Sequence, residues 1–158
     1  MTANWLPVVL VCSFLPTTGP LPGQTPAAAA YRLAHESVQL NLRVGDLLAF
    51  MEAQQNNTHE YEITGALVNI ASMGSDWALA ASDILSLYAL INTPTSKVAA
   101  QRVVTASLDR YAKFFREAAT LVNTQLAYTN IPAIADSAGK LRDHFRQVES
   151  YLSSLPLK

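Results

Sequence analysis

The sequence predicts an all-α protein, an antiparallel up-down-up-down four-helix bundle with left-handed, heptad-like packing. Three observations support this. The first is an apolar ladder in mid-chain whose steps alternate between four and three residues. The second is the recurrence of that spacing in three further segments. The third is that the breaks between these segments are short. A mean step of about 3.5 residues keeps one seam facing a partner only if the helices wind left-handed around each other. The ladder consists of Ile63, Leu67, Ile70, Gly74, Trp77, Ala81, Ile84, Tyr88 and Ile91.

Start signals place the helices along the chain. Thr25-Pro26 and Thr93-Pro94 each offer an N-cap residue followed by proline at the first helical position. Asn57 is a further N-cap residue. Helices are therefore expected over residues 26–55, 58–91, 94–129 and 132–154.

Two local patterns refine these boundaries. Glu60 follows Asn57 by three residues, where a capping box places an acid. The break before the last helix is Asn130-Ile131-Pro132, because the residue before proline is disfavoured in the helical region. Connections this short make consecutive helices antiparallel neighbours. Residues 26–158 are thus expected to form one bundle.

Residues 1–25 form a different kind of sequence, apolar and uncharged. Residues 5–15 are a continuous apolar run, too short to span a bilayer as a helix. Three interpretations remain open for it: a cleaved export signal, an ordered arm packed on the bundle, or peripheral membrane association through residues 5–15. Export to a periplasmic, secreted or lumenal location is favoured, although the segment lacks a basic residue. The only cysteine, Cys12, lies in this run, so no intramolecular disulfide is expected.

The last expected helix is about a third shorter than the others, which predicts incomplete cover at one end of the bundle. Apolar side chains near that end would then be exposed, and the N-terminal segment enters at the same end. Exposed apolar surface of this kind commonly marks a partner site. The candidate partner surface comprises Trp5, Leu10, Phe14, Ile84, Tyr88, Ile91 and Val98.

No motif for catalysis, metal or cofactor binding accompanies the bundle pattern. The histidines His35, His59 and His144 lack the Glu-x-x-His spacing of di-iron bundles, and the sequence has no C-x-x-C-H haem motif. A net charge of −1 supplies no long-range attraction for nucleic acid. We therefore expect no enzyme activity, no cofactor and no nucleic-acid partner.

The middle of the long ladder offers one candidate ligand pocket. Gly74 occupies a seam position, and Trp77 follows one turn later at about the level of Tyr111. A glycine in a core layer either opens a cavity beside aromatic walls or makes room for a bulky neighbour, here Trp77. Both interpretations remain open.

The sequence thus favours a non-catalytic helical bundle that acts through protein–protein contacts as a structural or accessory subunit. Its partner would be another protein or a second copy of the chain. The alternative is a ligand-binding or sensor-type bundle with a small apolar pocket in its core.

Overall fold

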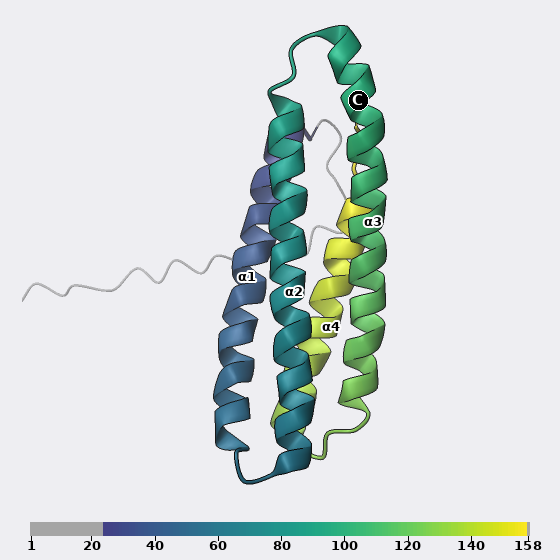
Figure 1. The fold of residues 1–158 in the computed structure, drawn as a ribbon. Coiled ribbons are helices and arrows are strands. Elements are labelled where there is room, and N and C mark those ends of the chain that lie inside the picture. Colours follow the sequence, from purple (N-terminus) through teal and green to yellow (C-terminus); the bar gives the residue numbers. More distant parts are fainter. Residues whose placement is uncertain (1–23, 158) are drawn as a thin grey trace, which may run out of the picture.

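The computed structural model describes residues 24–157, and this part of the chain forms four helices (Figure 1). Consecutive helices run antiparallel and pack side by side, so the expected bundle is confirmed. The helices end a few residues earlier than expected at their C-terminal ends. They are α1 (Pro26–Ala53), α2 (Thr58–Ala89), α3 (Pro94–Leu126) and α4 (Pro132–Ser153).

Two of the expected start signals act as N-caps. The Thr25 hydroxyl accepts a hydrogen bond from the Ala28 amide at 3.2 Å, and the Asn57 side chain accepts one from the Glu60 amide at 3.4 Å. Each bond satisfies an amide that has no partner within the helix. Thr93 makes no such bond, so α3 begins on proline alone.

Glu60 does not complete the expected capping box. Its side chain is buried at the start of α2 and faces the α3–α4 connection instead. The carboxylate accepts a hydrogen bond from the Thr129 hydroxyl at 2.6 Å and one from the Asn130 amide at 2.8 Å. Burial by itself raises the pKa of Glu60, but these two bonds outweigh it and lower the pKa below its ordinary value. Glu60 therefore ties the start of α2 to the connection between α3 and α4.

Small side chains allow α1 and α2 to approach closely. Ser82 Oγ donates to the carbonyl oxygen of Ala30 at 2.7 Å, and Ser75 Oγ donates to that of Ser37 at 3.0 Å. A serine hydroxyl is short, so a bond from it to the backbone of another helix requires the two backbones to lie close together. The Ser37 and Ser75 hydroxyl oxygens also lie 2.9 Å apart. These bonds satisfy polar groups that the interface buries.

Gly74 makes room for the ring of Phe145, not for Trp77. A Cβ atom at position 74 would lie 2.8 Å from Phe145 Cζ and closer still to Phe145 Cε1. Phe145 is fully buried and packs on Phe115, with ring centroids 5.6 Å apart. The contact joins α2 to α4 across the interior of the bundle.

Aromatic side chains fill the space between α2 and α3. Trp77 stacks on Phe114 at a centroid distance of 5.0 Å and meets Tyr111 edge-on at 5.1 Å. Rings of this size hold helices further apart than serine and alanine do. α2 and α3 are accordingly less closely packed against each other than α1 and α2 are.

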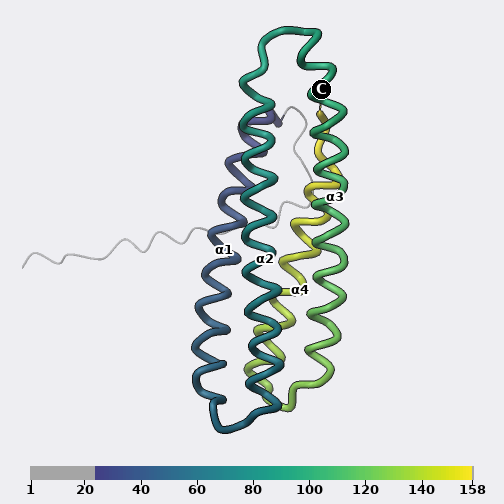
Figure 2. The backbone as a smooth tube through the Cα atoms, viewed as in Figure 1, coloured from purple at the N-terminus to yellow at the C-terminus, as the bar shows by residue number. Residues whose placement is uncertain are grey.

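The α2–α3 hairpin extends past the first turn of α1 and the last turn of α4 (Figure 2). This agrees with the lengths, since α4 has 22 residues while α2 and α3 have 32 and 33. The chain after α4 partly covers the gap. Leu155 and Leu157 pack against the core, and the Gln101 side-chain amide donates to the Leu157 carbonyl oxygen.

Tyr88 is consequently not exposed, and the expectation that it lacks cover is wrong. Only 1% of its surface is accessible. The Lys97 ammonium group lies 5.9 Å from the centre of its ring, and residues 154–157 extend the core beyond the last turn of α4. Counting helix residues alone could not reveal that Tyr88 is buried, because helix lengths do not say at which levels the helices and the segment after α4 lie against one another.

We predict that Gly74→Ala destabilises the protein by about 2 kcal/mol, because the new methyl group clashes with a ring that is held on its other side. Gly65→Ala is the matched control. A Cβ atom there meets Met51 at an ordinary 3.6 Å, so the gain in helix propensity should leave the protein at least as stable. Urea denaturation of the two variants measures the difference, and equal midpoints would contradict the packing described here.

Candidate functional site

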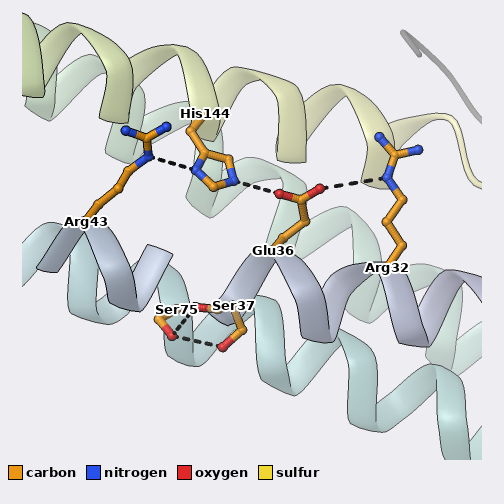
Figure 3. Close-up of polar contacts among 6 residues, drawn as sticks. All are labelled: Arg32, Glu36, Ser37, Arg43, Ser75 and His144. Carbon is orange, nitrogen blue, oxygen red and sulfur yellow. Dashed lines mark hydrogen bonds and ion pairs between the residues drawn. The ribbon is translucent and has the colours of Figure 1, made fainter. Parts of the chain in front are cut away.

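A chain of polar side chains crosses the interface between α1 and α4 (Figure 3). Arg43 Nε donates to His144 Nδ1 at 3.1 Å, and His144 Nε2 lies 2.7 Å from Glu36 Oε2. On its other side, Glu36 Oε1 is 3.8 Å from Arg32 Nε. Because Nδ1 accepts from a guanidinium group, the imidazole proton lies on Nε2 and is donated to the carboxylate.

Helical spacing brings these side chains together. Arg32, Glu36 and Arg43 are separated by four and seven residues, so they share one side of α1 and face His144 on α4. The Arg32 guanidinium carbon also lies 3.9 Å from the centre of the Tyr151 ring, one further contact between the same two helices. The polar chain therefore fixes how α1 and α4 sit against each other.

Burial and charge act in opposite directions on Glu36. Burial raises the pKa of its carboxyl group, but the hydrogen bond from His144 and the nearby charge of Arg32 outweigh that effect. The resulting pKa lies below the ordinary value of 4.5. Glu36 is thus held as a carboxylate, which suits a structural role better than proton transfer near neutral pH.

Sequence reasoning missed this polar chain. Residues 24–157 hold no group of three or more His, Cys, Asp or Glu side chains placed to bind a metal. The sequence analysis overlooked that His144 and Glu36 directly flank the seam residues Phe145 and Ser37. A side chain next to a seam residue lies close to a neighbouring helix. The positions of His144 and Glu36 beside their seams were therefore the sequence signal for this contact.

The candidate pocket residues do not surround an open space at Gly74. The Phe145 ring occupies the volume beside that glycine, while Trp77 and Tyr111 are half-buried and pack on each other. A shallow, open depression occurs elsewhere, on the side of α3 beyond the end of α4. It is lined by Val98, Gln101, Arg102, Thr105, Ala106 and Asp109, a largely polar set.

The candidate partner surface is only partly brought together. Val98 is 58% exposed, Ile84 and Ile91 are half-buried, and Tyr88 is in the core. Trp5, Leu10 and Phe14 lie outside the described residues, so their part in the surface stays a prediction.

Exposed apolar side chains also lie on two outer faces that the sequence analysis did not single out. One is the α2–α3 face, which comprises the exposed residues Met73, Leu87, Val103 and Leu121 with the half-buried Trp77, Ile84 and Phe114. The other is the outer side of α1, where Tyr31, Val38 and Leu42 are exposed. Both are visible in the sequence as second apolar ladders, one beside the core seam of α2 and the other opposite the core seam of α1.

Comparison with known proteins found no matching family model, no matching curated protein and no matching solved structure. Among residues 24–157, no helix is both long and apolar enough to cross a membrane.

We predict that Glu36→Gln lowers stability by about 1 to 2 kcal/mol at neutral pH, because it removes a charge-assisted hydrogen bond to His144. The folded-state pKa of Glu36 is lowered, so its contribution is present above pH 4.5 and is lost as pH falls through that lowered value. Urea denaturation at neutral pH and well below pH 4.5 should show the gap between wild type and variant closing. The exposed Glu62→Gln is the control, and a gap that stays constant with pH would refute the role assigned to Glu36.

Proposed function

We propose that the protein is a non-catalytic structural or accessory subunit and that its α2–α3 face binds an amphipathic helix of a partner protein. The observation that carries the proposal is the apolar character of this face. Met73, Leu87, Val103 and Leu121 each expose half or more of their surface to solvent. Apolar surface that is exposed and contiguous commonly marks a protein contact.

The layout of the face suits a helical partner. On α2, the residues Met73, Trp77, Ile84 and Leu87 lie on one side at helical spacing. The stacking of Trp77 on Phe114 sets the antiparallel register of α2 and α3. One heptad before Trp77 and one heptad after Phe114, Ile70 therefore lies level with Leu121. Two parallel rows of apolar side chains with aromatic rings between them resemble the surface onto which an amphipathic helix lays its apolar side.

Charged residues border this apolar face and would orient the partner. Arg110 and Glu117 are exposed on α3 alongside Phe114, and Glu117 forms an ion pair with Lys113 at 3.7 Å. An apolar centre with a polar rim is the usual anatomy of a protein interface. The rim adds specificity, because a partner helix with complementary charges fits in one direction only.

The proposal keeps the expectation of export and of peripheral membrane association, which rests on residues 1–25 of the sequence. A ligand held in the bundle core is the weaker candidate, since Phe145 fills the space beside Gly74. The polar contacts of Arg43, His144 and Glu36 between α1 and α4 support a structural role for the interior.

Site-directed photocrosslinking in cells that express the full-length protein tests the proposal. With benzoylphenylalanine at Leu87, we expect a discrete crosslinked product with a second protein, and none with the same probe at the exposed Gln147 of α4. Val103→Glu should reduce the yield at Leu87 about tenfold, because it places a charge in the apolar centre. Absence of a product at Leu87, or the same product from both positions, would overturn the proposal.

A further inference from the structure

The outer side of α1 carries a ladder of its own. Tyr31, His35, Val38, Leu42, Gly45 and Ala49 follow each other at steps of four and three residues. They lie opposite the buried residues Leu33, Leu40 and Leu47 of the same helix. Tyr31 is 80% exposed, Val38 55% and Leu42 60%.

Two properties distinguish this outer ladder from an ordinary solvent-facing helix side. None of its positions holds Asp, Glu, Lys or Arg, whereas solvent-facing sides of helices are typically charged. Its spacing is the heptad spacing that suits a second helix packed along it. The outer ladder runs for about 27 Å at the helical rise of about 1.5 Å per residue.

Gly45 provides an independent observation at the same place. A Cβ atom at position 45 would meet nothing within 4 Å, so the fold of the monomer does not require glycine there. Glycine inside a helix lowers its stability relative to alanine. Gly74 differs, because the Phe145 ring occupies its space. Gly45 thus weakens α1 without making room for a contact within the chain. The close approach of another backbone or side chain would explain why glycine stands there.

We propose that the outer ladder is the interface with a second copy of this chain, with the two α1 helices antiparallel about a two-fold axis. An axis midway between Val38 and Leu42 makes the ladder complementary to itself in size. Val38 then faces Leu42 of the second copy, and Tyr31 faces Ala49. His35 faces Gly45, where the missing side chain leaves room for the imidazole ring.

Charges agree with this arrangement. Asp46 lies beside Gly45 on the flank of the outer ladder where His35 also lies, so the two-fold axis places Asp46 of one copy beside His35 of the other. Glu52 comes level with Ala28 of the second copy. No like charges face each other along the outer ladder, and such repulsion is the usual obstacle to pairing identical surfaces.

This dimer interface is separate from the α2–α3 face, because it uses only the outer side of α1. The chain would form a two-fold dimer with an isologous interface while each copy keeps its α2–α3 face accessible. Either contact can therefore fail without the other.

Sedimentation velocity of the full-length protein, with reductant present to prevent disulfides through Cys12, tests the proposal. We expect the wild type to shift from monomer to dimer as its concentration rises through the micromolar range. Val38→Glu and Gly45→Trp should each weaken dimerisation at least about tenfold with unchanged helical circular dichroism. Position 45 is exposed and a Cβ atom there meets nothing within 4 Å, so Gly45→Trp should fold normally and block only the second copy.

Met73→Glu on the α2–α3 face is the matched control and should leave dimerisation unchanged. A wild type that stays monomeric at every concentration would overturn the proposal, and so would a dimer that survives both Val38→Glu and Gly45→Trp. Crosslinking through Leu87 in the Val38→Glu background separates this result from the proposed function, since loss of the dimer should not affect that product.

Discussion

The close packing of small side chains along α2 is the constraint on which the rest of the structure depends. Ser75 and Ser82 bond directly to the backbone of α1, and Gly74 leaves the space in which Phe145 of α4 lies. Larger residues at these positions would force α1 and α4 outward together, because protein interiors have little free volume to absorb a shift. With that side of the bundle fixed, the aromatic rings of Trp77 and Phe114 are left to fill the wider α2–α3 side.

Polar groups set the register that apolar packing leaves loose. Leucine and alanine seams tolerate small sliding movements, whereas a hydrogen bond has a narrow range of distances. The Arg43–His144–Glu36 contacts align α1 with α4, and buried Glu60 fastens the α3–α4 connection to the start of α2. These bonds act at different levels of the bundle. The apolar seams of the helices resemble one another and do not by themselves select one arrangement. Together, these hydrogen bonds do.

The fold could be predicted from the sequence because its signals are local. Heptad spacing defines each helix, and Thr25, Pro94 and Pro132 mark beginnings that depend on neighbouring residues only. What could not be predicted depends on residues distant in sequence. Phe145 at Gly74, His144 at Glu36 and the cover over Tyr88 all require the relative levels of helices, which spacing within one helix does not contain. The outer faces are a different case, since their ladders were present in the sequence but were not distinguished from the core seams.

We propose that this chain works through its outer faces while its described interior is structural. Hydroxyl-radical footprinting in an extract of expressing cells, compared with the dilute purified protein, tests this most directly. Tyr31, Met73 and Leu87 should be labelled in the dilute purified protein and protected in the extract, whereas Tyr128, which is 60% exposed and lies on neither face, should be labelled equally in both. Equal labelling of Tyr31, Met73 and Leu87 in the two samples would contradict the account.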